Sequence, residues 1–242
     1  MSHWTDKWEK QKASLGNMIM STHNHKRFIQ DMTIAERGYG KSTYHLQTMA
    51  YVYYHLVDKD ETAAWNYAID NLVFRPSQLL KRVEYNEENN IVSPVWCIDD
   101  AAVHFSNKLW WSDWSEAMLM DGIFDLIRPV LSCLLINCPD KSRLLGSLQN
   151  YLGYEETIYI GSNGGYNRDI IGIHWYRQPS GRKKWRKTWE DNYSCYIPNW
   201  VFEKYTLIRK GFIKEIRNNL KDLHYRRKQM QENKKAQSVS MP

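Results

Sequence analysis

The sequence predicts an α/β fold with a mainly parallel sheet in three layers, followed by a β-hairpin and a long C-terminal helix. Short apolar runs alternate with stretches of helical periodicity over residues 27–162, as in sheets whose parallel strands are joined by helices. Polar residues follow the ends of several apolar runs, and ligands bind at this edge of such sheets. After residue 162 the pattern changes to strand-like alternation and then to one helical stripe.

The first 162 residues divide into an N-terminal segment and a core. Apolar residues at helical spacing over 3–20 predict a helix, so residues 1–26 are interpreted as an N-terminal helix and linker. In the core, residues 27–162, strands are predicted at 27–34, 72–74, 94–99, 130–136 and 156–160. Helices are predicted at 41–57, 61–71, 77–90, 101–128 and 140–152.

Residues 163–228 predict a hairpin and a helix. Two strand-like segments, 170–177 and 184–188, flank the turn residues Pro179-Ser180-Gly181. A helix is predicted over 198–228 because apolar residues recur there every three or four positions, at Val201, Tyr205, Ile208, Phe212, Ile216, Leu220 and Leu223. The polar residues 229–242 are expected to form a disordered tail.

A glycine-rich loop precedes the first core helix and is typical of a phosphate-binding P-loop, or Walker A motif. Glycine lets backbone N–H groups face phosphates, the lysine reaches the β- and γ-phosphates, and the serine hydroxyl binds Mg²⁺. The helix N-terminus adds a positive dipole end. The usual motif begins with a glycine where this chain has Ala35, and a Gly-Lys-Ser triplet also arises by chance. The predicted nucleotide-binding residues are Arg37, Gly38, Tyr39, Gly40, Lys41, Ser42 and Thr43.

Two adjacent carboxylates end the apolar run Pro94-Val95-Trp96-Cys97-Ile98. P-loop enzymes need an acid at such a strand end to hold the Mg²⁺ shell, and a second acid can orient the attacking water. We therefore expect Asp99 to bind the metal together with Ser42, and Asp100 to polarise water. An ordinary turn after a buried strand is the alternative, since Asp favours turns.

A third strand end carries Asn137, which follows the apolar run 131–136. It stands where RecA-like and AAA+ ATPases have a polar sensor residue that contacts the γ-phosphate or the attacking water. The segment Asn137-Cys138-Pro139-Asp140 also has the composition of a simple turn, and the two interpretations are compatible.

The order of these motifs resembles that of the additional-strand P-loop ATPases. The passages CIDDAAVHFSNKLWW, LLINCPDKSRLLGSLQNY and IPNWVFEKYTLIRKGFIKEI resemble ATPases carried by archaeal viruses and plasmids. That group is similar to the zonula-occludens-toxin-like ATPases of phage assembly and DNA pumping. The resemblance covers residues 27–215 and implies a three-layer P-loop NTPase that uses ATP and Mg²⁺. Ala35 in place of glycine, and Asp100 in place of glutamate, depart from the usual patterns.

Related ATPases often complete their site with an arginine from a neighbouring subunit, which would make the active form a homo-oligomer. Arg143, just after the sensor strand, is the candidate catalytic arginine, and Arg128 is a second candidate. Lys41, Asp99, Asp100, Asn137 and Arg143 together form the predicted catalytic set.

Positive charge is concentrated in the C-terminal third. Residues 168–189 contain seven Lys and Arg against one Asp, whereas the whole 242-residue chain carries a net charge of +6. The candidate nucleic-acid contacts are Arg182, Lys183, Lys184, Trp185, Arg186 and Lys187. Basic and aromatic residues together suit a phosphate backbone and stacked bases, so DNA is the expected partner. A solvated basic turn is the alternative.

Composition narrows the setting of the protein. The four cysteines show no C-x-x-C pair, which favours a reducing interior rather than a disulfide scaffold. No apolar run is long enough to span a membrane, and we expect a cytoplasmic protein, in a host cytoplasm if the gene is viral.

Three functions fit this sequence. The first is an ATPase that couples Mg²⁺-dependent hydrolysis to DNA handling in replication, packaging or transfer of a mobile element. The second is a nucleotide-dependent switch or scaffold in assembly, without DNA translocation. The third is a small-molecule kinase with the basic hairpin as a lid, although the aromatic content of the hairpin fits a lid poorly.

Overall fold

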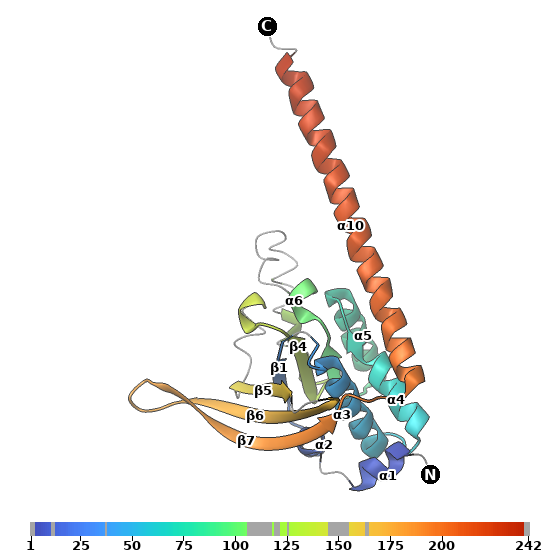
Figure 1. The fold of residues 1–242 in the computed structure, drawn as a ribbon, viewed down its shortest axis with the longest axis vertical. Coiled ribbons are helices and arrows are strands. Elements are labelled where there is room, and N and C mark those ends of the chain that lie inside the picture. The colour runs from blue at the N-terminus through green and yellow to red at the C-terminus, as the bar shows by residue number, and fades with distance from the viewer. Residues whose placement is uncertain are drawn as a thin grey trace. The chain divides into compact units, whose positions relative to one another are not determined.

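The computed structural model describes residues 3–10, 13–36, 38–105, 118, 122–124, 126–144, 155–162 and 165–239. The chain divides into two compact units, residues 1–197 and residues 198–242. The first unit contains one β-sheet and the helices that pack on it, and the second contains the helix α10, Asn199–Val239 (Figure 1). The mixed α/β architecture of the first unit agrees with the α/β class predicted from the sequence.

Seven strands of the described residues form one sheet in the order β2-β3-β4-β1-β5-β6-β7. Their bounds are Ile29–Ile34 (β1), Leu72–Val73 (β2), Trp96–Ile98 (β3), Cys133–Cys138 (β4), Glu155–Ser162 (β5), Asn167–Arg177 (β6) and Lys183–Ser194 (β7). Neighbours from β2 to β5 pair in parallel, and β6 and β7 join as an antiparallel hairpin. The hairpin reaches past β5 as a two-stranded ribbon (Figure 1).

The position of β4 between β1 and β3 brings three chain segments to one edge of the sheet. Ile98 of β3 pairs with Ile136 of β4, so the residues that follow, Asp99 and Asn137, are level with each other. Asn137 itself pairs with Thr33 near the end of β1. The parallel register therefore aligns the carboxyl ends of β1, β3 and β4.

Helices cover both faces of the sheet in the first unit. The helix bounds are His3–Lys10 (α1), Ser14–Asn24 (α2), Lys41–Leu56 (α3), Glu61–Asp70 (α4), Pro76–Asn89 (α5) and Ala101–His104 (α6), with a 3₁₀ turn at Lys141–Arg143. On one face, Met32 and Ile98 pack with Leu79 of α5 in a fully buried apolar cluster. On the other face, His45 of α3 contacts Thr33 and Cys97. Alternate strand residues therefore face different helices, which produces three layers.

The structure differs from the predicted elements at both ends of the chain. The segment 3–20 forms two helices, α1 and α2, instead of one. The helix α10 continues to Val239, through most of the segment expected to be a disordered tail. Lys, Gln, Glu and Ala dominate that segment and are good helix formers, which explains how the helix can continue. Most of the predicted helices over 101–128 and 140–152 lies outside the described residues.

Candidate functional site

The loop between β1 and α3 is shaped by two glycines. Gly38 has φ of 87° and Gly40 has φ of 82°, and this left-handed region favours glycine. Gly40 is also the N-cap of α3 and has no side chain to cap the first turn of the helix. The loop therefore takes a left-handed conformation at two positions, although Ala35 stands where the usual motif has its first glycine. Arg37, in the middle of the loop, lies outside the described residues.

The side chain of Lys41 folds back across this loop. Its Nζ donates hydrogen bonds to the carbonyl oxygens of Ala35 (2.6 Å) and Glu36 (2.9 Å). The ammonium group therefore lies against the start of the loop, where it neutralises the negative ends of two peptide dipoles. An anion bound by the loop would find a positive charge already positioned there.

Three predicted site residues from distant parts of the chain meet at the carboxyl edge of the sheet. Ser42 Oγ donates to Asp99 Oδ1 at 2.8 Å. Asn137 Nδ2 donates to the same carboxylate oxygen at 2.5 Å and to Ser42 Oγ at 2.9 Å. Asp99 and Asn137 are 1% and 3% exposed, so the carboxylate and the amide of this contact are both buried. Thr43 lies next to it in the first turn of α3, half-buried.

Asp100 differs from its neighbour Asp99 in both exposure and backbone geometry. Its φ of 50° and ψ of 40° lie in the left-handed region, and it is the N-cap of α6. A non-glycine residue pays a steric cost there, and such residues recur at functional sites. Asp99 is buried against Ser42 and Asn137, whereas Asp100 is partly exposed. The two carboxylates therefore occupy environments suited to different tasks.

The two candidate arginines lie in different places. Arg143 is exposed in the 3₁₀ turn shortly after β4, on the side of the sheet where Asn137 lies. Arg128 stacks over the ring of Phe28, 5.9 Å from its centroid, and both residues precede the strands β4 and β1. Arg128 is therefore at the opposite edge of the sheet from the Ser42–Asp99–Asn137 contact. Of these two arginines, Arg143 is the one on the side of the candidate site.

His45 is a buried partner of the site that sequence reasoning missed. One ring nitrogen lies 2.6 Å from Thr33 Oγ1, and the other lies 3.1 Å from Cys97 Sγ. Burial, and then the nearby Lys41 charge, lower the pKa of His45 from 6.5 to about 3. The neutral imidazole therefore joins α3 to β1 and β3 directly beneath the loop. The sequence could have indicated His45, because it follows Lys41 by four residues and so lies on the same face of the helix.

The strand β7 forms a wall behind the loop, which sequence reasoning also missed. Tyr193 Oη donates to the carbonyl oxygen of Gly40 at 2.8 Å and lies 3.3 Å from that of Tyr39. A Cβ atom on Gly40 would lie 2.5 Å from Cys195 Sγ, so this position accepts no side chain. Gln47 of α3 donates to the carbonyl oxygens of Ser194 and Tyr196. No local sequence pattern predicts these contacts, because the residues that make them are about 150 positions apart.

The candidate nucleic-acid residues gather at the tip of the β6–β7 hairpin. Arg182, Lys184, Arg186 and Lys187 are exposed, Trp185 is 55% exposed, and the side chain of Lys183 is outside the described set. Lys187 forms an ion pair with Glu190 at 2.6 Å. Trp189 packs against Gly172, where any Cβ would overlap the indole ring. Of the indoles whose side chains are described in this hairpin, Trp185 is therefore the more open to a stacking partner.

Comparisons with known proteins point to viruses. No family model matches the chain. A protein of Sulfolobus spindle-shape virus 1, described as "Uncharacterized protein B-251", is 24% identical over 86% of this chain and 84% of its own length. "Uncharacterized protein ORF286" of Acidianus two-tailed virus is 24% identical over 55% of this chain and 44% of its own length. These relatives are proteins of archaeal viruses, in agreement with the viral side of the resemblance.

Within the described parts of the chain, no helix combines the length and the apolarity needed to cross a membrane.

Proposed function

We propose that this protein binds ATP with Mg²⁺ at the β1–α3 loop, hydrolyses it, and couples the turnover to DNA handling in a virus or another mobile element. The observation that carries the proposal is the mutual contact of Ser42, Asp99 and Asn137. A Gly-Lys-Ser triplet that arose by chance would have no reason to lie beside a buried carboxylate and a buried amide. The strand order, with β4 between β1 and β3, is also that expected of an additional-strand ATPase.

The residues present fit a Mg²⁺·ATP complex. Ser42 Oγ and Asp99 Oδ1, 2.8 Å apart, are hard oxygen donors of the kind that Mg²⁺ prefers. The described residues contain no cluster of three or more His, Cys, Asp or Glu side chains that could hold a metal. Phosphate oxygens and water would therefore complete the coordination shell, as is usual for Mg²⁺ in nucleotide sites. The bound ion would neutralise charge on the phosphates.

The protein side chains have separate roles in this proposal. Lys41 would exchange the carbonyls of Ala35 and Glu36 for the β- and γ-phosphate oxygens. Asp100, partly exposed beside the buried Asp99, would orient and polarise the attacking water. Asn137 would turn its amide from Ser42 and Asp99 toward the γ-phosphate and so report its presence. Catalysis of this kind rests on positioning and electrostatic stabilisation more than on covalent chemistry. Arg143, from the same or a neighbouring subunit, would add positive charge.

The DNA-handling part of the proposal rests on the hairpin tip. Exposed cations next to the exposed indole of Trp185 suit a sequence-independent contact with a phosphate backbone and a stacked base. The viral relatives agree with work on a mobile genome, although their descriptions assign no activity.

The deciding experiment is the ATPase rate of the full chain with no DNA, single-stranded DNA and double-stranded DNA, each at low and high salt. Salt-sensitive stimulation would support an ATPase that works on DNA, because phosphate contacts weaken as salt rises. Hydrolysis that DNA does not change would support the switch or scaffold instead. Absence of both ATP binding and hydrolysis would refute the nucleotide site itself.

A further inference from the structure

One strand connects the hairpin tip to the phosphate loop. The strand β7 begins at Lys183, next to the basic tip, and ends at Ser194, where Tyr193 and Cys195 contact the loop. We propose that Tyr193 is a positioning residue through which a polyanion bound at the tip controls the loop conformation, and thereby nucleotide affinity and turnover. The inference rests on the proposed function, because it assigns a regulatory input to that site.

The contact between Tyr193 and the loop is direct and well defined. Tyr193 is 4% exposed, and its hydroxyl group donates to the carbonyl oxygen of Gly40, the N-cap of α3. Burial raises the pKa of Tyr193, with a further contribution from Cys195, so the hydroxyl stays protonated and available as a donor. Its ring centroid lies 4.9 Å from that of Tyr44 in the first turn of α3. Tyr193 therefore holds the residue at which the loop becomes helix.

The end of β7 has little freedom to move without the loop. Gly40 meets Cys195 so closely that no Cβ fits between them. Gln47, two helical turns further along α3, donates to the carbonyl oxygens of Ser194 (2.7 Å) and Tyr196 (2.8 Å). A shift at this end of β7 therefore displaces either the Gly40 carbonyl or the start of α3. Both of these groups shape the predicted phosphate-binding surface.

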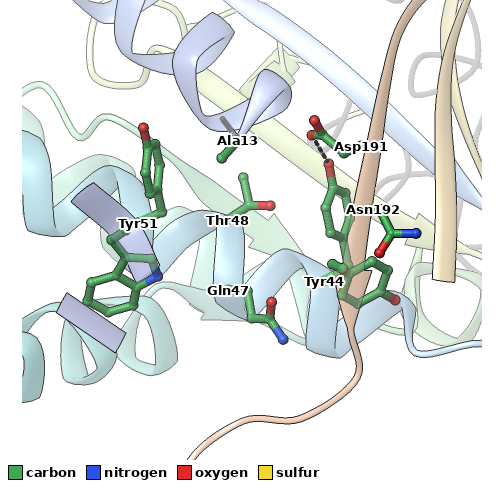
Figure 2. A pocket seen from close by; sticks show the side chains of 9 residues that line it. Ala13, Tyr44, Gln47, Thr48, Tyr51, Asp191 and Asn192 are labelled. Atoms are coloured by element: carbon green, nitrogen blue, oxygen red, sulfur yellow. Dashed lines mark hydrogen bonds between the residues drawn. The ribbon is translucent and has the colours of Figure 1, made fainter. Parts of the chain in front are cut away.

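The seam between α3 and β7 is incompletely filled, which leaves room for such a shift. A cavity of about 30 Å³ lies between Tyr44, Gln47, Thr48 and Tyr51 of α3 and Asp191 of β7 (Figure 2). That volume is enough for a water molecule. Asp191 accepts a hydrogen bond from Tyr44 Oη at 3.4 Å, the dashed line in Figure 2, which is a long bond. Toward α3 the strand is thus held closely at Tyr193 and by a longer bond at Asp191, whose carboxylate also accepts hydrogen bonds from the backbone N–H groups of Ser14 and Leu15.

The test compares Tyr193→Phe with Tyr166→Phe. The first change removes the hydroxyl group that holds Gly40 and keeps the ring that packs on Tyr44. The second removes a hydroxyl group from a side chain that is 78% exposed, in the turn between β5 and β6. We would measure kcat and KM for ATP in each full-length protein, with and without saturating linear double-stranded DNA, after thermal unfolding has verified the fold.

We expect DNA to stimulate the wild type and the Tyr166→Phe variant equally, and to leave the Tyr193→Phe variant near its basal rate. The KM of that variant for ATP should rise by roughly 2- to 10-fold, as the loss of one hydrogen bond allows. A purely structural role would lower the unfolding temperature but leave the ratio of stimulated to basal rates unchanged, which would overturn the inference. The inference would also be overturned if the wild type hydrolysed ATP at a rate that DNA did not change, although the proposed ATPase activity would then stand. A wild type that neither binds nor hydrolyses ATP would refute the proposed function itself.

Alkylation of Cys195 provides a readout that needs no substitution. The other three cysteines, Cys97, Cys133 and Cys138, are buried, whereas Cys195 is partly exposed and touches Gly40. Iodoacetamide should therefore modify Cys195 first, as peptide mass spectrometry would show. Adding DNA to the wild type should change that rate several-fold if the end of β7 moves against the loop. An unchanged rate with saturating DNA would overturn the inference even if Tyr193→Phe failed to fold.

Discussion

The buried contact between Ser42, Asp99 and Asn137 is the central residue-scale feature of this protein. Removing one member would take one hydrogen-bond partner from each of the other two, at a cost of about 1–3 kcal/mol. Burying polar groups costs desolvation free energy, so a fold that gains nothing from these groups would not be expected to keep them. Together with the glycine turns at Gly38 and Gly40, it is the best argument for a site that binds an anion and a metal.

At the residue scale, we expect Lys41→Ala to reduce ATP hydrolysis by at least about 100-fold, because the main positive charge facing the phosphates is lost. Lys59→Ala is the matched control, since Lys59 is exposed in the segment between α3 and α4. Phosphate release measured on both variants would test the assignment. Hydrolysis by Lys41→Ala at the wild-type rate would show that this loop is not the nucleotide site.

The buried, neutral His45 should make the stability of the fold sensitive to acid. Its pKa is about 3 in the folded chain and 6.5 ordinarily, so the unfolded chain takes up a proton that the folded chain excludes. Stability from this group is complete above the unfolded pKa and falls as the pH drops from 6.5 toward 3. The loss amounts to at most about 1.4 kcal/mol per pH unit.

Urea unfolding between about pH 7 and about pH 5 would measure this slope, because linkage ties it to proton uptake on unfolding. His45→Gln cannot titrate and should flatten the slope, whatever it does to the stability at neutral pH. His25→Gln, at an exposed position, is the control. Equal slopes in the wild type and His45→Gln would contradict the role given to His45.

At the scale of elements, the hairpin β6–β7 combines two surfaces of different character. Its tip carries the exposed cations and Trp185, whereas the end of β7 is packed against α2, α3 and the loop between β1 and α3. Asp191 accepts hydrogen bonds from the backbone N–H groups of Ser14 and Leu15, and so caps α2, whose own N-cap is Ala13. The hairpin is thus part of the core unit at one end and open to a partner at the other.

The tip should dominate the salt dependence of DNA binding. Replacing Arg182, Lys184 and Arg186 together by Gln should weaken the binding of double-stranded DNA. The negative slope of log K against log salt should become less steep by about 0.9 per lost phosphate contact. Lys26, Lys59 and Lys81, all exposed, would be replaced by Gln as a control with the same charge change. Fluorescence anisotropy over a salt series would measure both slopes. Equal slopes in the two triple variants would place the DNA surface elsewhere.

At the scale of the whole molecule, the proposed site belongs entirely to the unit formed by residues 1–197. Its parts come from β1, α3, β3, β4 and β7, so ligand binding and the stability of this unit must be linked. The second unit, α10, exposes Phe202 and Leu207 at 57% and 72% along its length. The helix therefore presents exposed apolar side chains that another surface could cover.

We therefore expect Mg²⁺·ATP to raise the unfolding temperature of the protein. At 100 times its Kd, a ligand that binds only the folded state adds about 2.7 kcal/mol of stability. Differential scanning fluorimetry would measure this shift, with EDTA to remove Mg²⁺ and Lys41→Ala as the variant without a site. A shift that persists in Lys41→Ala would mean that ATP binds at another place.

The sequence alone determined the α/β class of the fold, and it predicted candidate site residues, three of which the structure brings into contact. Asp99 directly after β3, Asn137 near the end of β4, and the loop before Lys41 could be recognised because strand periodicity, glycine turns and helix starts are encoded by neighbouring residues. The sheet order then brought these ends together, as expected for parallel strands whose carboxyl ends share one edge.

Only the tertiary structure decided the partners that support this site. Asp191 caps a helix 176 or 177 residues away, and Tyr193 holds a loop 153 residues away. His45 of α3 contacts Thr33 of β1 and Cys97 of β3, and no local pattern connects it to these two strands. The physical reason is that hydrogen bonds and packing depend on proximity in space. A single sequence records proximity only between neighbours along the chain.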